Sequence, residues 1–291
     1  MLNRVIKGNA SKSLSTVYLR YAVLSQLFLL TATASFGQIA FSPTILYLSD
    51  QEPVKEIRLS NVSDSYMEID ITARFGYPEW TESGSLEMVY DDSISATQFG
   101  LGDRLKIYPQ KAIIPPRAQQ TIRLRVANES INKNRLYWTR LGIRSGAAAQ
   151  PVGVTGITEQ TASVTFEVQQ NLGVYYKHGE LSTGVTLNSV NEISRSDTLK
   201  LAVSCSRTGN SPYVGIMSVR LVNGRGLSLA ESEQIVNLFF DSEIPVSLVT
   251  GELPAGQYKI EVRFETSRGD IPEGQLVSSP LQVFTREILI D

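Results

Sequence analysis

The sequence predicts an all-β protein built of two antiparallel β-sandwich domains that follow a cleaved signal peptide. Three observations predict this class. Short alternations of apolar and polar residues recur along the chain, clusters of turn residues separate them, and no stretch after the N-terminal segment shows sustained helical periodicity. Many short strands without crossover helices are typical of antiparallel sandwiches.

The N-terminal segment has the pattern of a secretory signal peptide. Four basic residues precede an apolar stretch over residues 21–30, and no acidic residue appears before Asp50. Small residues favour cleavage after Gly37, with cleavage after Ala34 as the competing site. A membrane anchor is the alternative, but a span needs about 20 predominantly apolar residues, and this stretch is shorter. We therefore expect an exported, periplasmic chain.

Removal of residues 1–37 would leave 254 of the 291 residues. That length suits two domains of about 100–150 residues each. We place the first domain at 38–176 and the second at 177–291. The net charge of −2 and the pI near 5.7 give no electrostatic support for nucleic-acid binding. Basic residues gather locally over 117–144, as on a solvated strand face, and an acidic partner surface is the alternative.

The strands can be placed by alternation and turn signals. In the first domain we expect them at 39–48, 54–62, 66–75, 105–108, 119–126, 136–143 and 164–176, and in the second at 184–190, 198–204, 214–222, 226–229, 234–240, 257–265 and 276–289. Asn223-Gly224 predicts a tight two-residue turn. Residues 76–102 are expected to form a polar loop with at most one short strand. Residues 145–160 are expected to form a mobile connection rich in small residues.

Residue types that carry catalysis or bind metal are scarce. The chain has one histidine, His178, and one cysteine, Cys205. A tetrahedral nitrogen and sulfur site needs more ligands, and residues 226–230 lack the last glycine of a nucleophile elbow. We expect Cys205 to be a small buried residue. The composition predicts a protein that is not an enzyme and has no cofactor or metal, with an exported carboxylate-pair hydrolase as the alternative.

A long alternation of apolar and polar residues runs over residues 164–176. Val164, Phe166 and Val168 share one face of this predicted strand. The segment exceeds the usual strand length of about 5–6 residues, and surplus length can serve as a binding edge. The same pattern also suits a strand that faces its own core, so both interpretations stay open.

Several short motifs follow one another in a recognisable order. They are Ser42-Pro43-Thr44, residues 57–61, Tyr108-Pro109, Ile114-Pro115, residues 120–124, residues 134–138 and, in the second domain, residues 210–214. In this order they resemble the motifs of the periplasmic pilus and fimbrial assembly chaperones, the PapD-like family. The resemblance covers most of the first domain and a patch of the second, as in a divergent member.

The resemblance implies two immunoglobulin-like domains and a donor-strand mechanism. A chaperone of this family fills the apolar groove of an incomplete subunit with the last strand of its first domain. Val164, Phe166 and Val168 match the inserting positions. The implied partners are pilin-like or other surface-structure subunits, with an outer-membrane usher as a further candidate, and neither nucleic acid nor stable membrane insertion is expected. A secreted or surface-displayed β-sandwich binding module is the alternative.

The chain departs from the family at the cationic anchor. The family holds the terminal carboxylate of the subunit with an arginine in the first strand and a lysine in the donor strand. Here Ile45 and Gly173 take those positions. Lys177 is one candidate replacement, and the arginines between Arg117 and Arg144 are others.

Overall fold

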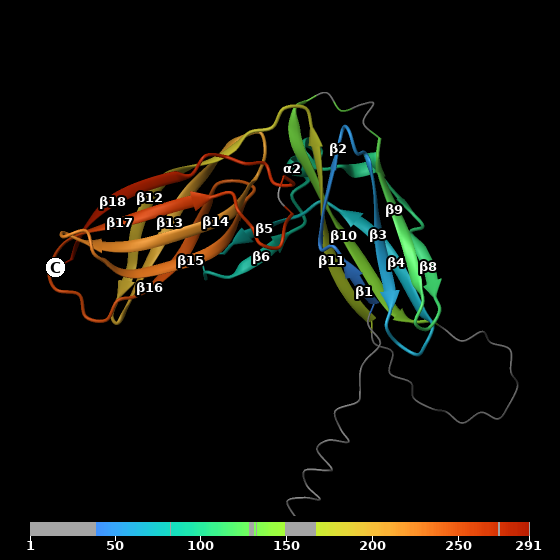
Figure 1. Ribbon diagram of the computed structural model, residues 1–291, viewed down its shortest axis with the longest axis horizontal. Helices are drawn as coiled ribbons and strands as arrows, with labels where there is room; N and C mark the ends of the chain where they lie inside the picture. The colour runs from blue at the N-terminus through green and yellow to red at the C-terminus, as the bar shows by residue number, and fades with distance from the viewer. Residues whose placement is uncertain are drawn as a thin grey trace, which may run out of the picture.

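The computed structural model describes residues 39–81, 83–127, 131, 133–148, 167–272 and 274–290. Figure 1 shows two β-rich lobes, the first containing most strands up to β11 and the second containing β12 to β18. The predicted all-β class with two antiparallel sandwiches is confirmed. The expected signal peptide at 1–37 lies outside the described residues. Across the described ranges, no helix is both long and apolar enough to span a membrane.

Two sheets form the first sandwich. The four-stranded sheet runs in the order β1 (Ile39–Ser42), β3 (Val54–Asn61), β9 (Gln119–Val126) and β7 (Leu105–Tyr108). The five-stranded sheet runs in the order β2 (Ile45–Ser49), β11 (Glu167–His178), β10 (Arg135–Ala147), β4 (Met67–Arg74) and β8 (Lys111–Ile114). Consecutive strands β1 and β2 therefore lie in different sheets, and the chain crosses between the sheets near Pro43.

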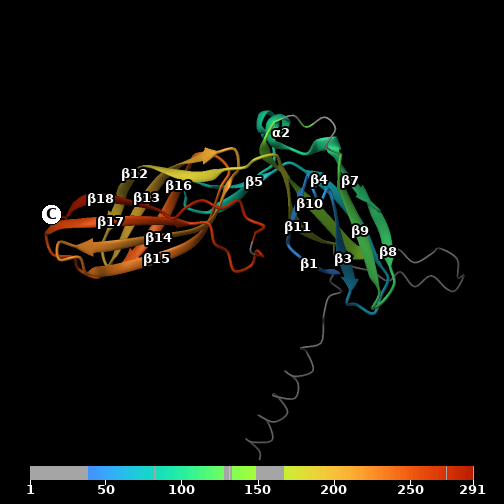
Figure 2. The same cartoon turned by 45° about the horizontal axis from the view of Figure 1, so that its top comes forward.

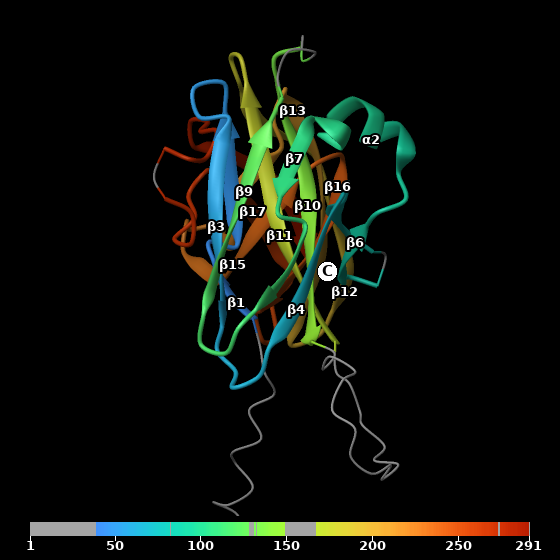
Figure 3. The ribbon, with the colours of Figure 1, turned by 90° about the vertical axis from the view of Figure 1, so that its right-hand side faces the viewer.

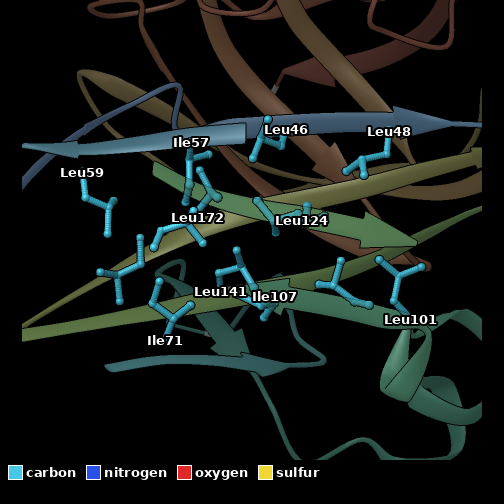
Figure 4. Packing of buried hydrophobic residues seen from close by; sticks show 14 of the residues in the cluster. Leu46, Leu48, Ile57, Leu59, Ile71, Leu101, Ile107, Leu124, Leu141 and Leu172 are labelled. Atoms are coloured by element: carbon cyan, nitrogen blue, oxygen red, sulfur yellow. The ribbon is translucent and has the colours of Figure 1, made fainter. Parts of the chain in front are cut away.

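Strand periodicity produces the core of this sandwich. In β9, Ile122 and Leu124 are buried while the residues between them are exposed, because successive side chains point to opposite faces of the sheet. Figure 4 shows Leu124 on one sheet and Leu141 and Leu172 on the other pointing into the same core. Each fully buried aliphatic side chain contributes about 1.5–3 kcal/mol, so this packing is the main source of stability in the lobe.

The second sandwich has a separate core. Its three-stranded sheet contains β12 (Thr183–Arg195), β13 (Thr198–Gly209) and β16 (Ser242–Val249). Its four-stranded sheet runs in the order β15 (Ser228–Leu238), β14 (Tyr213–Asn223), β17 (Gly256–Glu265) and β18 (Gln282–Ile290). Cys205 is fully buried here, as predicted, and burial raises the pKa of its thiol to about 12.

The chain between β4 and β7 corrects one prediction. Residues 76–102 are not a polar loop with at most one strand, because they contain β5 (Tyr77–Trp80), β6 (Leu86–Val89) and helix α2 (Ser93–Phe99), followed by the 3-10 turn η1 (Gly102–Arg104). The Asp92 carboxylate caps α2 by accepting from the Ser95 N–H at 2.9 Å. Trp80 packs against the core of the second lobe, and Figure 2 shows β5 reaching toward that lobe.

The turn between β14 and β15 is also longer than predicted. A two-residue turn at Asn223-Gly224 is wrong, because β14 ends at Asn223 and β15 begins at Ser228. Gly226 takes the left-handed conformation, with a φ of 79°. The Asn223 side-chain oxygen accepts from the N–H groups of Arg225 and Leu227, each at 3.0 Å. The Gly226 N–H also donates to the Asn223 carbonyl at 2.9 Å, so a tight backbone turn is present but is centred on Gly224 and Arg225. The two side-chain hydrogen bonds of Asn223 add to this turn.

Candidate functional site

β11 has a strand partner on both sides along only part of its length. β10 pairs with β11 from Glu167 to His178. β2 pairs only with residues 173–177, and the Gly173 N–H donates to the Thr44 carbonyl at 3.2 Å where this pairing starts. Residues 167–172 therefore have β10 on one side and, within the described ranges, no strand on the other. We call residues 167–172 the open edge.

The path of β1 explains why the open edge has no second partner. β1 pairs with β3 in the opposite sheet instead of continuing alongside β11. In a strand, the backbone groups of every second residue point to the same edge. Since the Gly173 N–H points toward β2, the backbone groups of Gln169 and Asn171 point to the open side. An exposed strand edge of this kind is a template for the addition of another strand.

The side chains of β11 continue one row from the core to the open edge. Leu172 and Val174 are buried in the first core, while Val168 and Gln170 lie on the same face and are half-buried. Val168, one of the three predicted inserting residues, therefore lies where the protein's own core ends. Val164 and Phe166 lie outside the described residues.

Strand β10 corrects the predicted mobile connection over residues 145–160. It runs to Ala147, and Ser145 is the register partner of Val168. Residues 145–147 are therefore part of a strand. Ser145 and Gly146 pair with Val168 and Glu167, so they belong to the paired side of the open edge. Residues 149–160 of the predicted connection lie outside the described residues.

Gly173 and Ile45, the predicted anchor positions, lie side by side. They are register partners in the parallel pair of β2 and β11. A Cβ atom on Gly173 would lie 2.8 Å from a terminal nitrogen of Arg140 and 3.1 Å from a ring carbon of Tyr175. Arg140 is the register partner of Gly173 on β10. The missing side chain at 173 therefore makes room for the Arg140 guanidinium.

The half-buried guanidinium of Arg140 lies among neutral groups. Its Nε donates to the Gly76 carbonyl at 3.3 Å, and its central carbon lies 5.8 Å from the ring centroids of both Tyr175 and Phe239. No ion pair of Arg140 occurs in the part of the chain that the structure describes. A partly buried cation without a counter-ion favours the binding of an anion. The sequence pointed only to a range of arginines that contains this one.

Lys177, the other candidate anchor, already contacts the second lobe. Its Nζ donates to the Gly274 carbonyl at 3.2 Å and lies 5.4 Å from the ring centroid of Tyr47. Burial lowers the pKa of Lys177. Lys177 shares a face with Gly173 but lies four residues further along β11, which corresponds to about 13 Å. These contacts favour a role in joining the lobes.

An aromatic cluster fills the space between the lobes. Tyr47 stacks on Tyr175 with ring centroids 5.0 Å apart, and Trp138 lies 4.9 Å from Phe239 and 5.0 Å from Phe99. Phe239 belongs to the second lobe and Phe99 to α2. The sheet face that carries Gly173 is therefore covered in part by the second lobe. Sequence reasoning missed this cluster, because the five residues named here come from five separate segments of the chain.

Asp50 holds the end of β11 and the connection between the lobes. Its carboxylate accepts from the Gly179 N–H at 2.9 Å and the Tyr176 hydroxyl at 2.8 Å, and lies 2.8 Å from Nδ1 of His178. Burial acts to raise the pKa of Asp50, but these hydrogen bonds outweigh it and hold the pKa below its usual value. The single histidine of the chain thus takes part in a structural hydrogen bond.

Asn210, the first residue of the motif at 210–214, forms a second set of hydrogen bonds that joins the lobes. Its side-chain nitrogen donates to the carbonyls of Asn134 and Glu180, each at 2.9 Å, and its side-chain oxygen accepts from the Ser182 N–H at 2.9 Å. One side chain therefore bonds to the first lobe and to the connection. Over the described ranges, no cluster of three or more metal-ligating side chains occurs.

Comparisons with known proteins found similar solved structures, but no family model and no curated protein sequence matches the chain. The Pseudomonas aeruginosa CupB2 chaperone is similar, with 12% identity, a TM-score of 0.42 and coverage of 85% of this chain and 98% of that chain. The class 5 fimbriae chaperone CfaA shares 13% identity with a TM-score of 0.45, covering 84% and 98%.

A third similar structure is the Salmonella enterica SafA pilin in complex with the SafB chaperone. It shares 11% identity with a TM-score of 0.40, covering 87% of this chain and 99% of that one. All three of these structures contain a chaperone, the class that the order of the motifs resembles.

Proposed function

We propose that this protein is a periplasmic assembly chaperone that lends the open edge of β11 to incomplete subunits of a fimbrial or other surface structure. The observation that carries the proposal is the open edge, where residues 167–172 have one strand partner among the described residues. A subunit that lacks a strand has unpaired backbone groups and an apolar groove. The backbone groups of Gln169 and Asn171 would pair with that subunit by β-strand addition. This activity is binding, without catalysis.

Side chains of the same strand would fill the groove of the subunit. Val168 is half-buried on the face that leads into the protein's own core. We propose that Val164 and Phe166 continue this row, since alternate residues of one strand share a face. Each apolar side chain that becomes fully buried in the groove would contribute about 1.5–3 kcal/mol.

The cation of Arg140 would anchor the terminal carboxylate of the subunit. The guanidinium lies across Gly173, is half-buried and forms no ion pair within the described ranges. A guanidinium can hold a carboxylate through two parallel hydrogen bonds. In this proposal the anchoring charge is carried by β10 instead of the neighbouring β11. Glycine at position 173, in place of the lysine expected from the resemblance, leaves space for the Arg140 guanidinium. Lys177 remains the second candidate.

Copurification from the periplasm tests the proposal. We expect a subunit with an incomplete β-sandwich to travel with the wild-type protein and to be lost from Val168→Asp, because a carboxylate in an apolar groove is strongly disfavoured. Val249→Asp is the matched control, since Val249 is 77% exposed at the second lobe. Retention of the subunit by Val168→Asp would contradict the proposal. Cell fractionation that finds the protein on the cell surface would favour a displayed binding module.

A further inference from the structure

The outward face of the sheet β1-β3-β9-β7 carries an excess of positive charge. Its cationic side chains are Arg58 on β3, Lys106 on β7, and Arg123 and Arg125 on β9, and all of them are exposed. We call these four residues the cationic face. Glu56 is the one carboxylate on the same face of the sheet. The face is thus strongly positive in a chain whose net charge is −2.

The charges of the cationic face are poorly balanced by its own residues. Arg123 pairs with Glu56 at 2.9 Å. Lys106 lies directly opposite Arg125 in the register of β7 and β9, and like charges at opposed positions destabilise a sheet. Within the described ranges, Arg58, Lys106 and Arg125 form no ion pair. These like charges repel one another in the isolated chain. Carboxylates from a bound molecule would neutralise them and relieve the repulsion.

The equivalent surface of the second lobe is different. Arg220 on β14 lies 3.7 Å from Glu231 on β15 and 3.8 Å from Glu261 on β17. Neighbouring strands there provide charges of opposite sign. The outward face of that sheet nevertheless carries more carboxylates (Glu231, Glu233, Glu261, Glu265 and Glu287) than cations (Arg220, Lys259 and Arg263). A second copy of the chain is therefore a competing occupant, which the cross-linking experiment separates from another protein.

We propose that the cationic face is a docking surface for an acidic surface of another protein. Charge complementarity commits the proposal to an acidic partner. The face also presents Tyr108, which is 79% exposed, and Val54, which is 41% exposed. Arginine and tyrosine are enriched where proteins meet. A flat sheet face with these side chains suits another folded protein better than insertion into a membrane.

The cationic face is separate from the open edge. Figure 3 looks onto the first lobe with β3, β9 and β7 in front and the second lobe behind. The open edge belongs to the other sheet of the sandwich. A subunit on β11 and an acidic protein on the cationic face could therefore bind together, and this inference does not depend on the proposed function.

Photo-crosslinking in the native cells tests the docking surface. A photoreactive residue at Thr121 samples the face without removing a charge, because Thr121 is exposed and opposite Arg58. We expect an adduct with another protein whose cross-linked peptide is rich in aspartate and glutamate. The triple variant Arg58→Gln, Lys106→Gln, Arg125→Gln should lower the adduct yield about tenfold.

The matched control removes the same charge from the second lobe. It is Lys200→Gln, Arg225→Gln, Lys259→Gln, three exposed positions, and it should leave the yield unchanged. We expect the melting temperature of the face variant to equal or exceed that of the wild type, because the opposed like charges are relieved. If the triple variant fails to fold, Arg125→Gln alone should still lower the yield.

Several outcomes would overturn the inference. They are the absence of a protein adduct at Thr121, an adduct with a second copy of the chain, a cross-linked peptide without an acidic excess, and a yield that the face variant leaves unchanged. Vesicles of phosphatidylcholine with and without phosphatidylserine provide the lipid comparison. Charge-dependent binding to the anionic vesicles, without a protein adduct, would assign the face to a membrane surface instead.

Discussion

The two halves of β11 share a neighbour on one side and differ on the other. Residues 173–177 lie between β10 and β2, and Val174 is fully buried. In the part of the chain that the structure describes, residues 167–172 pair with β10 alone, and Val168 is half-buried. Both halves continue the same alternation of side chains. Leu172, in the half without β2, is nevertheless fully buried, so burial falls off between Leu172 and Val168. The comparison shows that one alternation of side chains can serve the core at one end of a strand and an edge at the other.

The largest expected difference between the two halves of β11 is their response to a buried carboxylate. Val174→Asp is expected to lower the free energy of unfolding by more than about 3 kcal/mol, because it buries an unpaired charge and removes apolar contacts. Val168→Asp should cost less than about 1 kcal/mol, as is usual for a residue outside the core, yet abolish copurification of the subunit. Denaturant unfolding and copurification measure the two effects. We expect Phe166→Asp to have the same two effects as Val168→Asp, a small loss of stability and the loss of subunit copurification.

Arg140 on β10 covers Gly173, on the face of β11 that points away from the first core. Arg140→Ala should weaken subunit binding about 10–100-fold, which corresponds to the loss of hydrogen bonds between charged groups. Adding Gly173→Lys to this variant should restore part of the affinity, since the new lysine would occupy the vacated space. Titration of the purified subunit measures both variants. If the double variant binds the subunit no more tightly than Arg140→Ala, the proposal that a cation on β10 replaces one on β11 would be contradicted.

Lys177→Ala should have a smaller effect on binding than either change above. Its ammonium group contacts the Gly274 carbonyl and the Tyr47 ring, so we expect a loss of about 1 kcal/mol or less in the free energy of unfolding. Affinity for the subunit should stay within about threefold of the wild type. A loss equal to that of Arg140→Ala would assign the anchor to Lys177.

The smallest expected effect is on the pH dependence of stability. It involves Asp50, which bonds to the end of the half of β11 that lies between two strands. The pKa of Asp50 is lowered in the folded protein, so its hydrogen bonds contribute stability above the ordinary aspartate pKa, and that contribution is lost as the pH falls through the lower folded value. Asp50→Asn should remove this part of the acid dependence below a pH of about 4. Thermal melts between neutral pH and pH 3 measure it, and equal acid dependence in both proteins would contradict the assignment.

The sequence predicted the strands and the fold well, because alternation and turn residues are local signals. Ile122 and Leu124 are buried as their spacing predicts. Helix α2 was missed, because it has only seven residues and buries none of them. The turn predicted at Asn223-Gly224 was misplaced, because the backbone turn bond joins Gly226 to Asn223 and the Asn223 side chain adds hydrogen bonds that periodicity does not reveal.

The candidate site was only partly predictable. Gly173 and Ile45 were recognised as the anchor positions, and the structure pairs them in register. That Arg140 lies across Gly173 could not be predicted, because the two residues meet only through the pairing of β10 with β11. The open edge also depends on where β2 begins to pair, which is a property of the crossing at Pro43 and not of β11.

Amide hydrogen exchange tests the central claim that the open edge of β11 receives the subunit. The purified chain should be compared with the complex that copurifies from the periplasm. We predict that the amides of Gln169 and Asn171 exchange rapidly in the free chain and slow by at least about tenfold in the complex, since their N–H groups would then pair with the subunit. The amide of Val174 should be protected in both. Equal exchange of Gln169 and Asn171 in the two states would contradict the proposed mechanism.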